Sequence, residues 1–213
     1  MLEELIPTYC ERVGTGMFSE PVNLISNVGF FLAAYFLWKK THVKHLGASG
    51  YLFAGLLFSV GVGSSIFHAF PGSGTLLLDA VPIYCFILAV SLVLLSKLFG
   101  MATTIVTLIS FVVVQILIST LVPVDFINGS MRHVTTFLAL ALLTFAAYRQ
   151  TGSKIYPLVF AVLGYGIAIL FRSLDLTVCE SIFFGTHFMW HLLVSLAAYL
   201  AVSYTIELRK TSV

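Results

Sequence analysis

The sequence has few charged residues, and this scarcity excludes a water-soluble globular domain. Of its 213 residues, 11 are Lys or Arg and 9 are Asp or Glu, together 9% of the chain, whereas soluble domains contain about 25%. The hydrophobic share is 59% and the mean hydropathy is +1.04. The net charge of +2 is too small to say anything about nucleic acid, and we expect no nucleic-acid partner. The composition predicts an integral membrane protein, and it points to no protein partner.

Other common features are also missing from the sequence. The beginning, MLEELIPTYCE, is acidic and lacks the basic region of a signal peptide, so we expect no cleavage. We find neither a convincing internal repeat nor a low-complexity segment. The chain is too short for a soluble domain beside a membrane domain. We therefore expect a single domain over 1–213, with residues 1–21 as an extracytoplasmic N-terminal segment.

Long apolar stretches dominate the rest of the chain. A helix that crosses the hydrocarbon core needs about 20 mostly apolar residues. The breaks carry charges or turn residues, such as the basic segment KKTHVKH at 39–45. The fold is therefore predicted to be all-α, a bundle of seven transmembrane helices. The predicted spans are 22–38, 49–70, 75–97, 102–122, 133–149, 155–172 and 181–206.

The positions of the basic residues predict the orientation of this bundle, because Lys and Arg gather in cytoplasmic loops. With seven spans, one side collects Lys39, Lys40, Lys44, Lys97, Arg149, Lys154, Arg209 and Lys210. The other side has Arg12, Arg132 and Arg172. We therefore expect the N-terminus outside and the C-terminus in the cytosol.

The three cysteines fall into two groups in this topology. Cys10 and Cys179 lie on the outer side, where disulfides persist. We expect a bridge between them, which would tie the N-terminal segment to the start of the last helix. Cys85 lies within the third span and is interpreted as a small hydrophobic residue of the core.

Three of the predicted spans carry polar side chains that are unusual in hydrocarbon. The second span has Ser64 and His68, the third has Asp79, and the seventh has His187 and His191. The topology places all of them in the outer half of the bilayer. An Asp at the bilayer centre costs about 2.5–3.5 kcal/mol on insertion scales, so it marks a functional site by default.

These side chains together are typical of a catalytic zinc site. Histidines four residues apart on a helix direct both rings to one point, and His68 would supply a third ring. Three protein ligands leave the fourth zinc position open for chemistry. Asp79 could accept a proton from water, and Ser64 could donate a hydrogen bond to an oxyanion.

Each of these residues also has a simpler interpretation. A membrane His commonly hydrogen-bonds a neighbouring helix, and Ser64 could merely pack helices together. Ser65 is nearly as well placed as Ser64. His133, at the start of the fifth span, is interpreted as structural or facing water. The convergence of three helices at one depth favours the metal site.

The motifs resemble the alkaline ceramidase family, which belongs to a superfamily of seven-helix membrane hydrolases that includes the adiponectin and progestin receptors. The likeness extends from Tyr9 to the end of the seventh span. It is carried by YCERVGTGMFSEPVNLISNVGF, SSIFHAF, LLLDAVPI, RSLDLTVC and GTHFMWHLL. The short loops and CERVGTGMFSEPVN resemble bacterial members.

The resemblance implies roles for the residues that match. His68, His187 and His191 would bind zinc, Asp79 and Ser64 would be catalytic, and the family disulfide matches Cys10 and Cys179. Animal members also bind calcium near the N-terminus. Glu11 and Glu20 match two of those carboxylates, whereas Thr8 and Val13 stand where the family has other ligands.

The function that these features predict is a zinc-dependent amide hydrolase. It would take ceramide or a similar N-acyl lipid from the bilayer and release a fatty acid and a sphingoid base or lipid amine. We expect a multi-pass protein of a bacterial inner membrane, with its active site in the outer half. The alternatives are a non-catalytic receptor or lipid-binding protein with a structural metal site, and a proton-coupled transporter.

Overall fold

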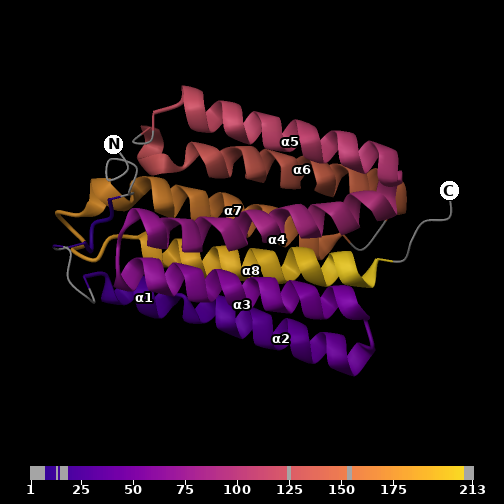
Figure 1. Ribbon diagram of the computed structural model, residues 1–213, viewed down its shortest axis with the longest axis horizontal. Coiled ribbons are helices and arrows are strands. Elements are labelled where there is room, and N and C mark those ends of the chain that lie inside the picture. Colours follow the sequence, from indigo (N-terminus) through magenta and orange to yellow (C-terminus); the bar gives the residue numbers. More distant parts are fainter. Residues whose placement is uncertain (1–7, 13, 15–18, 124–125, 153–154, 209–213) are drawn as a thin grey trace.

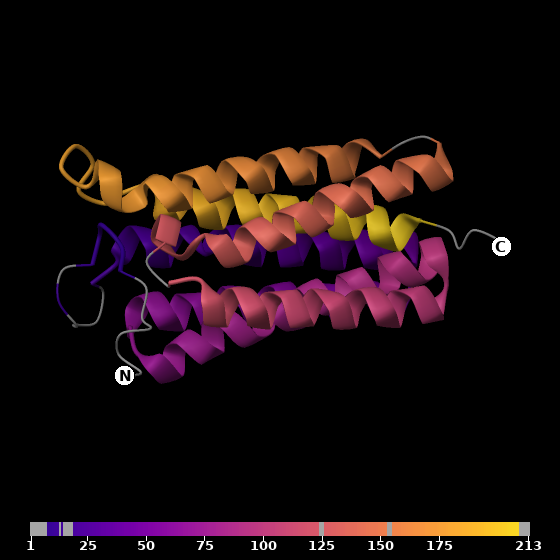
Figure 2. The ribbon, with the colours of Figure 1, turned by 90° about the horizontal axis from the view of Figure 1, so that it is seen from above.

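The fold is a bundle of long helices that lie side by side (Figures 1 and 2). The computed structural model describes residues 8–12, 14, 19–123, 126–152 and 155–208. Within this part of the chain there is no strand, and seven helical spans are long and apolar enough to cross a membrane when α1 and α2 are taken together. The predicted all-α, seven-span architecture is confirmed, and it indicates a multi-pass membrane protein.

The helices follow one another with short connections. Their bounds in chain order are α1 Pro21–Ser26, α2 Val28–Lys44, α3 Ala48–Ala69, α4 Ser73–Phe99, α5 Met101–Leu121, η2 Phe126–Gly129, α6 Met131–Thr151, α7 Tyr156–Leu174, η3 Asp175–Val178 and α8 His187–Glu207. Here η marks a short 3₁₀ helix. We call the end of the bundle that holds α1 and the start of α8 the α1 end; the last residues of α8 lie at the other end (Figure 1).

At two places the end of a helix differs from the predicted span by several residues. The helix α2 continues through Lys44, so the basic segment 39–45 is not a loop. Its last turns pack against α8, where Lys40 Nζ lies 3.2 Å from Glu207 Oε2 and Lys44 Nζ donates to Glu207 Oε1 at 2.5 Å. Lysine is also a good helix former. The last helix begins at His187 rather than at residue 181, because residues 181–186 form a turn.

The expectation for Cys85 was also wrong. The thiol is exposed on α4 instead of packed in the core. A bundle in a membrane has lipid rather than water outside, so an apolar side chain gains little by facing inward. Composition alone cannot tell the two faces of such a helix apart.

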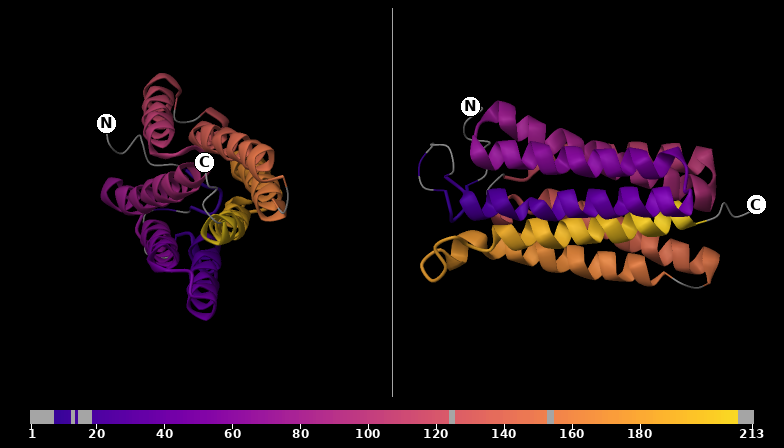
Figure 3. Two further views of the ribbon diagram at one scale, coloured as in Figure 1. Left: turned by 90° about the vertical axis from the view of Figure 1, so that its right-hand side faces the viewer. Right: turned by 90° about the horizontal axis from the view of Figure 1, so that it is seen from below.

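The last helix lies between α7 and α2, as the end-on view of Figure 3 shows. It also contacts α3 and α4. Residues of α8 belong to both clusters of buried side chains, one shared with α4, α6 and α7 and the other with α2, α3 and α4. A side chain at the start of α8 therefore faces several helices at once.

Gly63 brings α3 and α4 into close contact beside Asp79. A Cβ at Gly63 would lie 1.9 Å from the carbonyl oxygen of Leu78 and 3.2 Å from the backbone nitrogen of Asp79. The Leu78 carbonyl has no helical partner four residues later, because Pro82 has no N–H. Only a residue without a side chain allows α3 to lie against this carbonyl, and the contact sets the position of Asp79.

Several residues used in the sequence predictions lie outside the described part of the chain. These are Val13, Lys154, Arg209 and Lys210. The orientation of the bundle in a membrane stays a prediction.

Candidate metal centre

Three histidine side chains meet at the α1 end of the bundle. His68 is the second-last residue of α3, and His187 and His191 lie on the first two turns of α8. All three are buried, and one ring nitrogen of each lies within 4.8 Å of the others. Nε2 of His68 is 3.2 Å from Nε2 of His191. The structure thus brings together the three predicted ligands as a group that could hold a metal ion.

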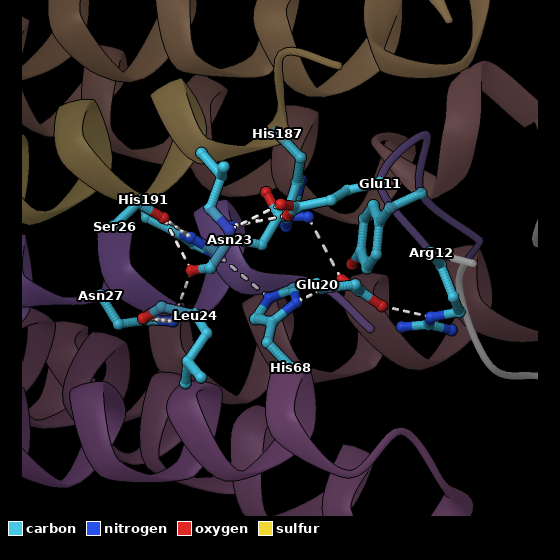
Figure 4. A network of polar contacts seen from close by, with 12 residues as sticks. Glu11, Arg12, Glu20, Asn23, Leu24, Ser26, Asn27, His68, His187 and His191 are labelled. Carbon is cyan, nitrogen blue, oxygen red and sulfur yellow. Dashed lines mark hydrogen bonds and ion pairs between the residues drawn. The ribbon is translucent and has the colours of Figure 1, made fainter. Parts of the chain in front are cut away.

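Two of these rings are oriented by partners at the two ends of α1, Glu20 just before it and Ser26 as its last residue (Figure 4). Nδ1 of His68 lies 2.6 Å from Oε2 of Glu20, and Nδ1 of His191 lies 2.7 Å from Oγ of Ser26. The Ser26 hydroxyl donates its own proton to the carbonyl of Asn23. Both histidines can therefore donate from Nδ1, which leaves Nε2 with a lone pair facing the centre of the group.

The three donor atoms lie within 4.8 Å of one another, and one pair has the separation that a tetrahedral metal ion such as zinc requires. Tetrahedral zinc lies about 2.0–2.1 Å from each imidazole nitrogen, which places two such nitrogens roughly 3.4 Å apart. The separation of 3.2 Å between the two Nε2 atoms is close to that value. Without a cation between them, two lone pairs at this distance would repel each other.

His187 has different neighbours. Its ring stacks on Tyr9 with 3.9 Å between ring centroids. Nη1 of Arg172 lies 3.4 Å from Nδ1 of His187 and donates to the Tyr9 hydroxyl at 3.2 Å. Burial raises the pKa of the Tyr9 hydroxyl, and the charge of Arg172 opposes that rise. Tyr9 therefore stays a neutral phenol that covers the histidine group.

Asp175 holds the start of α8 in place, and sequence reasoning missed this role. Its Oδ1 accepts the backbone N–H groups of Thr186 at 2.7 Å and His187 at 2.8 Å, and its Oδ2 accepts the N–H of Cys10 at 3.0 Å. A carboxylate at a helix N-terminus satisfies free N–H groups and complements the helix dipole. It comes from η3, more than ten residues earlier, so no local capping motif was visible.

Gly185 explains why α8 starts as late as His187. Its backbone has φ of +62°, and a Cβ there would lie 2.1 Å from Oδ1 of Asp175. Residues 181–186 therefore form a turn around this carboxylate instead of a helix. His187 becomes the first helical residue.

The predicted disulfide is present. Cys10 and Cys179 are bonded, with 5.3 Å between their Cα atoms. Together with the hydrogen bond from Cys10 to Asp175, it ties the N-terminal segment to the loop before α8. This positions Tyr9, Glu11 and Glu20 over the three histidines.

The two candidate calcium ligands have protein partners. The Glu11 carboxylate accepts the N–H groups of Val22 at 2.6 Å and Asn23 at 2.8 Å, whereas Glu20 pairs with Arg12, Asn23 and His68. Burial raises the pKa of both carboxyls; these backbone bonds oppose the rise at Glu11, and Arg12 opposes it at Glu20. Calcium binding stays a prediction, and an ion would have to replace these partners.

A cavity of about 680 Å³ opens next to the histidines. Ser64, Asp79, His187 and His191 line it, whereas Ser65 does not. Oδ1 of Asp79 is buried and has no hydrogen-bond partner among the described residues. The structure thus places Ser64 and Asp79 beside the metal group. The position in the helix left Ser65 nearly as well placed, whereas the family resemblance selected Ser64.

Away from the histidines the cavity is long and apolar. It follows α4 from Leu76 to Phe99, which at 1.5 Å per residue is roughly the thickness of a hydrocarbon core. His133 also lines it and packs on Trp190, with 4.3 Å between ring centroids. The apolar lining includes Ile83, Ile87, Val90, Leu95, Leu108, Phe111, Leu140, Leu143, Val194 and Ala201. The shape and lining suit an acyl chain.

Comparison with known proteins indicates the family of the chain. The model of the Ceramidase family matches residues 8–212, nearly the whole chain. No curated protein matches it. The matched range includes each residue of the histidine group and of the cavity described above.

Proposed function

The chain belongs to the ceramidase family, and we propose that it is a zinc-dependent hydrolase of ceramide or another N-acyl lipid. Membership of the family implies a hydrolase that acts on amide bonds. The observation that carries the proposal is a group of three buried histidines, two of which, His187 and His191, line one end of a long apolar cavity. The acyl chain of an N-acyl lipid fits such a cavity, and the amide group of the lipid then lies beside the metal ligands.

The residues present fit a zinc ion. Three neutral imidazoles with no carboxylate among them are a donor set that zinc accepts, and it leaves a coordination position open. When bound, zinc would act as a Lewis acid and activate water at neutral pH. Glu20 and Ser26 would keep the rings of His68 and His191 turned toward it.

Asp79 is proposed to move the proton in this reaction. It lines the cavity, and its Oδ1 has no partner among the described residues. Water adds to the amide carbonyl carbon while Asp79 accepts its proton. The carbon–nitrogen bond then breaks, and Asp79 returns the proton to the leaving amine nitrogen. The products are a fatty acid and an amine.

Ser64 is proposed to assist at the carbonyl oxygen. It lines the cavity together with Asp79. It could donate to the oxygen that gains negative charge during the addition of water. Lipid would enter sideways from the bilayer, and the basic residues favour the α1 end in the outer half of a bacterial inner membrane.

Metal analysis and lipid hydrolysis test the proposal. Purified protein should contain one zinc per chain, and His187→Ala should lose it. The protein should release fatty acid from at least one lipid in a panel of ceramides and other N-acyl lipids. Asp79→Asn should keep the zinc and slow release by about 100-fold or more. Ser64→Ala should be slower than its matched control, Ser65→Ala.

The alternatives give different results in the same experiment. Zinc without fatty acid release from any lipid would favour a receptor or lipid-binding protein. Protein without stoichiometric zinc would exclude the metal site, and a transporter that uses Asp79 and the histidines to relay protons would then be favoured.

A further inference from the structure

Arg172 is a buried cation beside the histidine group, and the proposed reaction does not use it. It lies on the last turn of α7, is 7% exposed and lines the cavity. Its guanidinium lies between the rings of Tyr9 and Trp190, 5.6 and 5.4 Å from their centroids. Nη1 contacts Tyr9 and His187, and Nε is buried with no partner among the described residues.

No carboxylate of the described residues forms an ion pair with Arg172. Asp175 is three residues further along the chain, but its oxygens accept the N–H groups of Cys10, Thr186 and His187. Removing a charge from water without a partner costs several kcal/mol. A guanidinium in this position is a strong binding group for an anion that enters the cavity.

Arg132 adds a second positive charge to the same cavity. It lies on the first turn of α6 and lines the cavity, and it has no carboxylate partner in the described part of the chain. Among the described lining residues, Asp79 is the one acid. Two arginines against one carboxylate leave a positive excess before any metal ion is counted.

We infer that the cavity binds an N-acyl lipid whose amine part carries an anionic group, a carboxylate or a phosphate, and that Arg172 binds this group. This rests on the proposed function, because the amide lies at the metal group and the acyl chain along α4. The amine part of the lipid then extends toward the first turn of α6 and the last turn of α7, where Arg132 and Arg172 lie. Arginine suits this role because its planar fork matches carboxylate and phosphate oxygens.

The test compares matched lipids that differ in charge. N-palmitoylglycine is compared with N-palmitoylethanolamine for the carboxylate, and ceramide 1-phosphate with ceramide for the phosphate. Binding is measured on zinc-loaded Asp79→Asn protein, which does not consume the lipid. Arg172→Gln, Arg172→Lys and Arg132→Gln are added one at a time, with Arg149→Gln on the distant end of α6 as the control.

The anionic member of at least one pair should bind more tightly than its neutral partner. Arg172→Gln should weaken binding of the anionic lipid by roughly 10- to 100-fold, because a hydrogen bond to a charged group is lost. It should change binding of the neutral lipid little. Arg172→Lys should restore part of the preference, and Arg149→Gln should keep all of it. The pair that responds identifies the carboxylate or the phosphate.

Equal binding of charged and neutral lipids would overturn the inference. An equal loss of binding affinity for both lipids in a folded Arg172→Gln protein would also overturn it, since that would make Arg172 structural. If Arg172→Gln does not fold, Arg132→Gln decides in the same way: an undiminished preference for the anionic lipid overturns the inference. Binding is measured without turnover, so an anionic preference in a protein that releases no fatty acid would refute the proposed function alone.

Discussion

Replacement of Asp175 by Asn tests whether one carboxylate positions the start of α8. The side chain is fully buried and accepts three backbone N–H groups, from Cys10, Thr186 and His187. Asn has nearly the same size and keeps one acceptor, so the change removes the charge and one acceptor without creating a cavity.

The expected loss of stability follows from these three bonds. A hydrogen bond to a charged group contributes about 1.5–3 kcal/mol and a neutral one about 0.5–1.5 kcal/mol. A loss of about 1 kcal/mol per bond gives about 3 kcal/mol for Asp175→Asn. For a chain of this size, each kcal/mol lowers Tm by about 2–4 °C, so Tm should fall by about 6–12 °C.

Thermal unfolding of the purified protein in detergent measures this change, with Glu180→Gln as the control. Glu180 is an exposed carboxylate in the same segment. Zinc affinity, measured by competition with a chelator, should fall by about 10- to 100-fold, because His187 follows directly from the bonded turn. If Tm of Asp175→Asn stays within roughly 2 °C of the control and zinc binding is unchanged, Asp175 does not hold the start of α8.

Three further changes test other parts of the site. Glu20→Gln should weaken zinc binding by about 10- to 100-fold, because His68 loses its charged acceptor; chelator competition measures it, and an affinity equal to that of Glu180→Gln would contradict the orienting role. Reduction of the disulfide, or Cys10→Ser, should lower Tm by several degrees, since removing a native disulfide costs about 2–5 kcal/mol in small secreted domains. Cys85→Ser is the control, and an equal Tm for Cys10→Ser and Cys85→Ser would show that the bridge adds no stability. Gly63→Ala should lower Tm and the rate of hydrolysis, because its Cβ would lie 1.9 Å from the Leu78 carbonyl oxygen and overpacking costs about 1–3 kcal/mol. Gly55→Ala is the control and should have neither effect, because Gly55 has open space around it. Equal behaviour of the two variants would argue against the close contact of α3 and α4.

Much of the architecture could be predicted because it depends on local composition. Hydrocarbon requires long apolar helices, so runs of apolar residues mark the spans directly. The histidines at i and i+4 share a helix face by geometry alone, and His68 and Asp79 follow once the spans alternate in direction. The pairing of Cys10 with Cys179 follows from the same alternation.

The errors occur where the deciding partner is distant in sequence. The charged turn at the end of α2 stays helical because Glu207 of α8 lies beside it. The exposure of Cys85 depends on which helices cover α4. Ser64 and Ser65 differ only in which of them faces the cavity.

The composition and spacing of the residues were enough to indicate a chain with several membrane spans and to predict three histidines and an aspartate at one depth. Those features depend on periodicity and on the cost of polar groups in hydrocarbon. The contacts that hold the site became visible in the folded chain alone. Glu20 and Ser26 orient the rings of His68 and His191, and Asp175 sets the first residue of α8. The fold also placed Arg172 beside the cavity with no carboxylate at ion-pair distance in the described part of the chain. These contacts join segments far apart in the chain, so only packing brings them together.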